Sequence, residues 1–260
     1  MKKFFENIKK YKKYAIRSAK AELKSEVADS RLNWSWWIIE PLCFMLIYTF
    51  VFGIIFPNNT LYFASFVMVG QAAWDFFNRM ITGSVKLIAN NRDLVTKVYI
   101  PKYILLFAKS LTYLFKMFIS LGLAFGLMIF QGVPFTWHMI LIIPILIVLY
   151  IICFGAGMIL MHFGVTLNDL SNLTNIALKM VFYLSGIFYN INERLKGTLG
   201  FVLLRVNPIA FCMNELRKVT VFGKLPSIEG LLVWLSIGMI LCAIGIHVIH
   251  KNENSYAKVI

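Results

Sequence analysis

The residues of this sequence that could do chemistry are charged side chains set within long apolar segments. Glu40, Asp75, Arg79 and Lys116 lie in stretches that are otherwise almost entirely hydrophobic. A charge inside a membrane is costly, so such residues face a partner or a polar cavity, or they mark a functional path. Asp75 and Arg79 are four residues apart and can pair on one helix face. These positions indicate ion pairing or contact with a charged cargo.

Two of these residues leave alternatives open. Glu40 can face a polar cavity, pair with Arg31 or Arg79, or extend to the membrane surface. Lys116 lies about 20 Å along its helix, too deep to reach the surface easily. It could attract a pyrophosphate or an anionic polymer, or it could form a pair with Glu40 or Asp75.

The sequence contains no motif of a common hydrolase. GxxxxGK[ST] is absent, so the chain cannot hydrolyse ATP by that device, and neither HExxH nor GxSxG occurs. His247 and His250 share a helix face without a recognisable third ligand, so packing at the membrane surface is the simpler interpretation. The four cysteines lack zinc or CxxC spacing and are expected to be buried and reduced. We therefore predict no catalytic residue and no metal site.

The composition is that of a membrane protein. Hydrophobic residues make up 59% of the chain and the mean hydropathy is +0.73, whereas soluble domains are about 45–50% apolar. The net charge of +14 comes from basic residues that gather between the apolar runs. Such clustering sets membrane topology by the positive-inside rule, and it does not indicate nucleic-acid binding.

The apolar runs predict an all-α integral membrane fold with six transmembrane helices and both ends in the cytoplasm. The predicted inner segments hold sixteen Lys and Arg residues and the outer ones six, which supports this orientation. We divide the chain into a cytoplasmic helix over 1–33, a transmembrane domain over 34–250 and a cytoplasmic tail over 251–260. A tight outer turn is predicted at 57–60. The six spans are predicted at 34–56, 61–81, 103–130, 137–163, 173–189 and 231–249.

Residues 1–33 predict an amphipathic helix on the cytoplasmic membrane surface. They carry ten Lys and Arg residues, each of which gains about 1 kcal/mol near anionic lipid. Apolar side chains fall close to the opposite helix face, as expected for a helix in the headgroup layer. They are Phe4, Ile8, Tyr11, Ala15 and Ala19. A solvated basic arm is the alternative.

Residues 91–101 form a short polar segment between two apolar runs. Asn90 or Asn91 can cap a helix there, and Pro101 disfavours helical geometry at Ile100. The spacing predicts a helix of about two turns with an apolar stripe of Leu94, Val95, Val98 and Tyr99. Basic residues around the segment place it on the cytoplasmic side. It is either a connector at the membrane surface or a contact site for a cytoplasmic partner.

This segment resembles the cytoplasmic coupling helix of ATP-binding-cassette permeases that export polysaccharide. The family pattern is roughly Asn-x-x-Leu-Val-x-Lys-x-x-(aromatic or Ile)-Pro. The residues that match it are Asn91, Leu94, Val95, Lys97, Ile100 and Pro101. An N-terminal amphipathic helix, Arg31 six residues before Trp37 and the pair Asn207-Pro208 extend the resemblance over nearly the whole chain. It implies that a separate ATPase docks on residues 91–101, through Asn91, Arg92, Asp93, Leu94, Val95, Lys97, Tyr99 and Pro101.

Aromatic residues are concentrated in the first two predicted spans, where fourteen of them lie between residues 34 and 81. Sugars present C–H faces that stack on aromatic rings, so such a wall suits a polymer conduit. The alternative is an interfacial aromatic belt with Phe packed against lipid. Our candidates for the conduit are Trp34, Trp36, Trp37, Tyr48 and Phe52, together with Lys116.

The region 194–222 contains two short apolar pieces, 199–206 and 209–213, separated by Asn207-Pro208. Neither piece can cross a bilayer, so we predict two re-entrant helices that dip from the outer face. The resemblance implies that they line an external gate, with Leu203, Leu204, Arg205, Asn207 and Pro208 as candidates. An ordinary extracellular loop is the alternative.

The resemblance implies a permease subunit that exports a lipid-linked polysaccharide of the O-antigen, capsule or teichoic-acid class across the cytoplasmic membrane. Its expected partners are a second copy of itself, an ABC ATPase dimer that binds ATP and Mg, the lipid-linked glycan and membrane lipids. The chain itself is expected to need no cofactor. An exporter of small amphipathic drugs and a membrane enzyme or scaffold acting on lipid-linked sugars are the alternatives.

Overall fold

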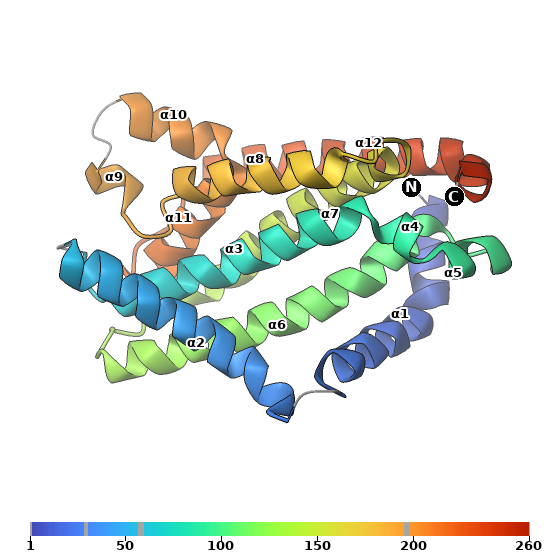
Figure 1. Ribbon diagram of the computed structural model, residues 1–260. Coiled ribbons are helices and arrows are strands. Elements are labelled where there is room, and N and C mark those ends of the chain that lie inside the picture. The colour runs from blue at the N-terminus through green and yellow to red at the C-terminus, as the bar shows by residue number, and fades with distance from the viewer. Residues whose placement is uncertain (1, 29–30, 57–59, 195–197, 260) are drawn as a thin grey trace.

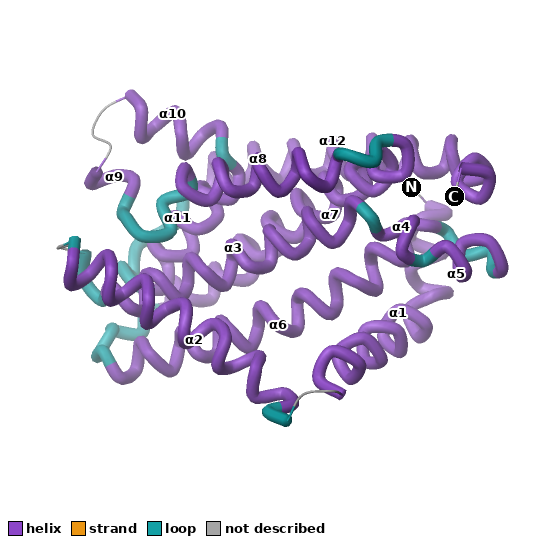
Figure 2. Tube along the Cα trace, in the orientation of Figure 1, coloured by secondary structure: helices purple, strands orange, loops and turns teal. Residues whose placement is uncertain are grey.

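The computed structural model describes residues 2–28, 31–56, 60–194 and 198–259, and within these ranges all regular structure is helical. Most of the long helices run roughly side by side along one axis (Figure 1). The short helices α4 (Leu87–Asn90) and α5 (Arg92–Lys97) lie at one end of the bundle. α9 (Ile191–Arg194) and α10 (Thr198–Val206) lie at the other. Figure 2 shows loops at these two ends and a further turn where the chain passes from α1 (Lys2–Ala28) to α2 (Trp36–Thr49).

A central helix organises the bundle. α3 (Phe63–Val85) is buried without interruption from Ser65 to Trp74 and packs against α6 (Lys102–Phe130) and α7 (Ile142–Thr166). α2 (Trp36–Thr49) and α8 (Leu170–Leu184) also contact it.

α12 (Ile228–Val259) packs closely along α7. A Cβ on Gly155 of α7 would lie 2.7 Å from the backbone nitrogen of Cys242 in α12, so this contact requires glycine.

The helix bounds differ from the predicted spans mainly at their ends. The first predicted span is composite, because a 3₁₀ turn at Asn33–Ser35 precedes α2 and a π-helical stretch at Phe50–Ile55 follows it. A 3₁₀ turn at Trp137–Leu141 precedes α7. α8 begins three residues before its predicted span and ends five residues earlier, and α12 continues into the predicted tail. The predicted turn at 57–60 lies largely outside the described residues, as do residues 195–197 of the predicted gate region.

Among the described residues, four helical segments are long and apolar enough to cross a membrane. They are Asn33–Ile55, Lys102–Phe130, Trp137–Thr166 and Ile228–Glu253. α3 carries several polar side chains and α8 has only 15 residues, so neither meets the same criterion. The chain is thus a multi-pass helical membrane protein.

The expectation that all four cysteines are buried is wrong for one of them. Cys153 and Cys212 are buried and Cys242 is half-buried, whereas Cys43 is exposed. Cys43 lies on the face of α2 that points away from the bundle, where this chain supplies no packing partner.

Candidate functional site

Three helices enclose an open groove along α3, which we call the α3 groove. Its narrower part has a volume of about 390 Å³, and we name it the Gln71 pocket. The wider part has a volume of about 630 Å³, and we name it the Lys179 pocket. Both parts are lined by Trp74, Asn78 and Phe182, so they form one continuous surface between α2 and α8. Their volumes fall within the range of about 300–1,000 Å³ that is usual for ligand sites.

The floor of the groove is a polar stripe on α3. Gln71, Asp75, Asn78 and Thr82 all line it, and their spacing of four, three and four residues puts them on one helix face. The stripe extends for about 16 Å at 1.5 Å per residue. Sequence analysis missed this pattern, although its helical period was visible between the apolar residues of the second predicted span. A row of polar side chains inside an apolar helix is expected to face a partner or a cavity.

Gln71 is the most unusual member of the stripe. It is 3% exposed, and its Oε1 has no hydrogen-bond partner among the described residues. A buried polar atom without a partner is rare and costs about 1–3 kcal/mol, so each such atom needs an explanation. Here the atom belongs to a residue that lines the Gln71 pocket.

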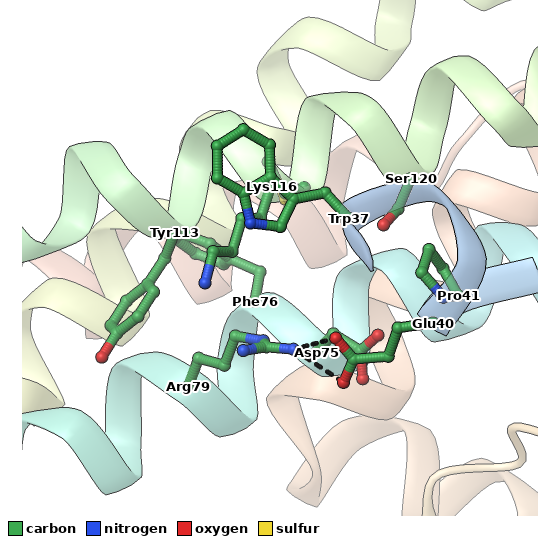
Figure 3. A pocket seen from close by; sticks show the side chains of 10 residues that line it. Trp37, Glu40, Pro41, Asp75, Phe76, Arg79, Tyr113, Lys116 and Ser120 are labelled. Carbon is green, nitrogen blue, oxygen red and sulfur yellow. Dashed lines mark hydrogen bonds and ion pairs between the residues drawn. The ribbon is translucent and has the colours of Figure 1, made fainter. Parts of the chain in front are cut away.

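Glu40 forms its ion pair across the groove with α3. The Arg79 Nη2 atom lies 3.2 Å from Oε1 and 3.3 Å from Oε2 of Glu40 (Figure 3). Arg79 was one of the two expected partners of Glu40. The predicted pair between Asp75 and Arg79 is not the one formed, because the guanidinium turns toward α2 while Asp75 stays beside it. The three side chains together line the Gln71 pocket.

Aromatic rings form one wall of the groove. Tyr48 and Phe52 of the first span pack against Phe188, with ring centroids 4.6 Å and 4.4 Å away. Phe182 of α8 lies 5.2 Å from Trp74 and joins this cluster to α3. Tyr48 lines the Gln71 pocket, whereas Phe52 does not line it and stacks on Phe188.

The three tryptophans predicted for the conduit lie apart from this wall. Trp34 and Trp36 are exposed at the start of the first span. Trp37 packs edge-on against Phe115 of α6, 5.4 Å between ring centroids, and lines a small cavity beside Glu40 (Figure 3). The structure therefore brings together Tyr48 and Phe52 but separates them from the tryptophans.

Lys116 has a different partner from those expected. Its Nζ lies 2.5 Å from Oε2 of Glu26 in α1 (Lys2–Ala28), and not beside Glu40 or Asp75. About two helix turns earlier on α6, Lys109 forms an ion pair with Glu22 of α1. α1 packs along α6, so a row of acidic residues on α1 meets a row of lysines on α6.

The apolar face predicted for residues 1–33 is confirmed, but it contacts protein. Ala15 and Ala19 are buried, and Phe4, Ile8 and Tyr11 pack against the core. Asn7 also donates a hydrogen bond to the Tyr103 hydroxyl over 2.7 Å.

The segment 91–101 forms a shorter helix than predicted. α5 ends at Lys97, and the chain is extended at Val98 before α6 begins. Asn91 does not cap α5, because its Nδ2 donates to the Leu87 carbonyl oxygen 2.7 Å away. Pro101 instead stands at the N-cap position of α6.

The predicted apolar stripe of this segment is divided between the interior and the surface. Val95 is buried and Leu94 half-buried, whereas Val98 and Tyr99 are 47% and 73% exposed. The nearby Glu253 carboxylate raises the pKa of the Tyr99 hydroxyl, which shows that α12 reaches this end of the bundle. Arg92 is exposed, as is the ion pair of Asp93 with Lys97. One side of the segment therefore packs against the bundle, and the other side is exposed.

At the opposite end, α10 and α11 (Pro208–Thr220) meet at the predicted Asn-Pro pair. Asn207 caps α11 by accepting hydrogen bonds from the backbone nitrogens of Ile209 and Ala210, and Pro208 occupies the first helical position. Asn207 also donates to the Ser185 hydroxyl over 2.9 Å, which ties this junction to the end of α8.

The other gate candidates lie on α10. Leu203 and Leu204 are half-buried, and the Arg205 guanidinium is exposed above the Phe201 ring at 4.1 Å. α11 is longer than the apolar piece that predicted it, because polar residues complete its buried face.

Sequence analysis missed the role of Arg217, which it counted only as one of the six basic residues of the outer segments. Arg217 is 4% exposed and donates to the carbonyl oxygens of Phe66, Gly186 and Ile187 over 2.8–3.0 Å. Its guanidinium also lies 3.6 Å from the centre of the Phe66 ring. A Cβ on Gly70 would lie 2.1 Å from Nη2, so the glycine makes room for this side chain. Arg217 therefore joins α11 to α3 and to the turn after α8.

Long apolar helices with a polar groove between them, and a short, partly exposed helix at one end, are typical of a membrane transport protein. The sequence matches the family of ABC-2 type transporters over residues 17–221, and the chain belongs to that family. It is similar to the O-antigen export system permease protein RfbA of Myxococcus xanthus, with 24% identity over 248 residues that cover 95% of both chains. Two proteins of the same description from Klebsiella pneumoniae are 20% and 22% identical, and 92% of each chain is covered.

Proposed function

We propose that this chain is the membrane subunit of an ATP-driven exporter that moves a lipid-linked polysaccharide across the cytoplasmic membrane. The observation that carries the proposal is the α3 groove, where stacked aromatic rings face a row of amide, hydroxyl and carboxylate groups. A sugar polymer needs both surfaces, since its C–H faces stack on rings and its hydroxyls bond to polar groups. Similarity along nearly the full length of O-antigen export permeases supports the same cargo class.

In this proposal two copies of the chain form the pathway between them. The α3 groove is open on one side, and exposed apolar side chains of α2 and α8 flank the opening. They include Leu46, Ile47, Ile176 and Met180. A second copy placed against these side chains would bury them and close the groove into a channel.

The energy for transport comes, in this proposal, from a separate ATPase dimer that binds ATP and Mg. It docks on residues 91–101, where Val98 and Tyr99 offer apolar surface and Arg92 offers charge. Because α5 lies between α4 and α6, and α4 follows directly after α3, movement of the docked ATPase would shift the floor of the groove.

The proposed topology has six spans with both ends of the chain in the cytoplasm. α3 and α8 complete the four apolar spans, since the groove accounts for the polar residues that α3 exposes. α10 and α11 dip from the outer face as re-entrant helices and form the gate. The hydrogen bonds of Asn207 and Arg217 to the end of α8 support this placement. They provide partners for polar groups that would otherwise be unpaired inside the membrane.

The proposal is tested in cells that lack their own permease and receive this chain with its ATPase. Replacing Tyr48 and Phe52 by alanine together should reduce surface glycan several-fold without lowering the amount of folded protein. Phe118→Ala is the matched control, because Phe118 is 57% exposed on α6, away from the groove. Full glycan export by the double variant would contradict the proposal.

A further inference from the structure

We propose that the Gln71 pocket is a subsite for one uncharged sugar residue of the cargo and that it disfavours acidic sugars. The inference rests on the proposed function, and it adds the chemical class of sugar that the pathway accepts at this point. Three features of the pocket carry it: a buried amide oxygen without a hydrogen-bond partner among the described residues, two carboxyl groups beside one guanidinium, and an aromatic wall.

The Gln71 amide is the first feature. Oε1 is buried and unpaired among the described residues, yet the side chain lines an open pocket. A hydroxyl group satisfies either atom of an amide, because it both donates and accepts a hydrogen bond. A sugar ring presents several hydroxyls, and any one of them that reaches Oε1 can donate the missing hydrogen bond.

The second feature is the charge of the pocket. Glu40 and Asp75 contribute two carboxylates, and Arg79, already bonded to Glu40, contributes the one cation that lines the Gln71 pocket. Lys116 lies nearby but is paired with Glu26. An acidic sugar would therefore place a third carboxyl group here, beside a guanidinium that Glu40 already occupies. Like charges in a partly buried site repel by several times more than in water.

The third feature is the ring wall beside these polar groups. Trp74 and Tyr48 line the same pocket as Gln71, on two different helices. Rings beside a few directed polar groups are the usual composition of a small-ligand site. The Lys179 pocket continues the groove with a different charge, since Lys179 is exposed there. The two pockets therefore differ in the group that each favours.

Binding of two matched probes tests the subsite. Radiolabelled octyl β-D-glucoside and octyl β-D-glucuronide differ only in a hydroxymethyl or a carboxylate group on the sugar. Each is titrated into the permease–ATPase complex held in lipid nanodiscs without nucleotide. We expect the glucoside to bind on the order of tenfold more tightly, from the carboxylate repulsion in the pocket.

Variants assign the selectivity to residues. Asp75→Asn should improve glucuronide binding and reduce the preference to about twofold, because the repelling charge is removed. Gln71→Leu should weaken glucoside binding roughly three- to tenfold, the usual value of one or two hydrogen bonds. Ser236→Ala is the control. It removes an exposed hydroxyl on α12 that lines neither pocket of the groove, and both affinities should stay as in the wild type.

Equal binding of the two probes by the wild type would overturn the inference. Unchanged glucoside binding by Gln71→Leu would also overturn it, because the amide would then bond only to water. The proposed function fails separately. If the complex binds the probes selectively but exports no glycan in cells, the subsite stands and the export assignment falls. If it exports glycan but binds both probes alike, only the subsite falls.

Discussion

The hydrogen bonds of Arg217 predict a large and specific loss of stability when they are removed. Arg217→Met keeps much of the side-chain volume but leaves the carbonyl oxygens of Phe66, Gly186 and Ile187 without this donor. A hydrogen bond from a charged donor contributes about 1.5–3 kcal/mol, and water that enters the site recovers part of it. We expect the free energy of unfolding to fall by about 3–5 kcal/mol, as for other broken buried charge networks.

A second variant tests the same hydrogen bonds by changing Gly70, which has no side chain of its own to lose. A Cβ there would lie 2.1 Å from Nη2 and 2.8 Å from Cζ of Arg217, so Gly70→Ala must displace the guanidinium from its three acceptors. Both single variants should therefore lose stability through the same contacts. In the double variant the losses should not add, because residues in direct contact share one interaction.

The assay is thermal unfolding of the purified permease in detergent. Each single variant should unfold roughly 10 °C lower than the wild type. Gly122→Ala is the control, because nothing lies within 4 Å of a Cβ at that position. A neutral Gly70→Ala, or a double variant whose loss equals the sum of both singles, would refute the reasoning.

Three further predictions follow from other contacts. Lys116→Glu should destabilise the protein by about 1–2 kcal/mol in thermal unfolding, because it breaks the ion pair with Glu26. Adding Glu26→Lys in the same chain should restore most of the loss. If it restores nothing, the ion pair does not hold α1 against α6. Leu94→Asp or Lys97→Glu should reduce co-purification of the ATPase at least several-fold while the fold is retained, and unchanged co-purification would argue against docking on residues 91–101. Asn207→Ala should cost about 1 kcal/mol of stability through the lost cap, and wild-type unfolding would show that the cap contributes little.

Much of the fold was predictable because hydropathy and charge act locally. Each predicted span overlaps a helix, and four of the six predicted spans are long and apolar enough in the described residues to cross a membrane. The apolar side of residues 1–33 packs against the bundle as its period indicated. The Asn-Pro pair marks the junction of α10 and α11, because proline at the first helical position and a capping asparagine are determined by nearest neighbours.

Contacts between distant segments were harder to predict. Nothing in the residues around Lys116 shows that α1 folds back along α6, so its partner Glu26, ninety positions earlier, was not considered. Arginine side chains are usually exposed, so the sequence around Arg217 favours a position on the surface. The space left by the missing side chain of Gly70 allows its guanidinium to be buried. Asn91 and Arg79 show the same limit, because several acceptors compete for one donor side chain and tertiary packing decides between them.

The most direct test of the central claim is glycan translocation in proteoliposomes that contain the permease with or without the ATPase. We predict that lipid-linked glycan crosses the membrane only when both proteins and ATP are present, and that Leu94→Asp abolishes the flux. Translocation at full rate by the permease alone would contradict the account.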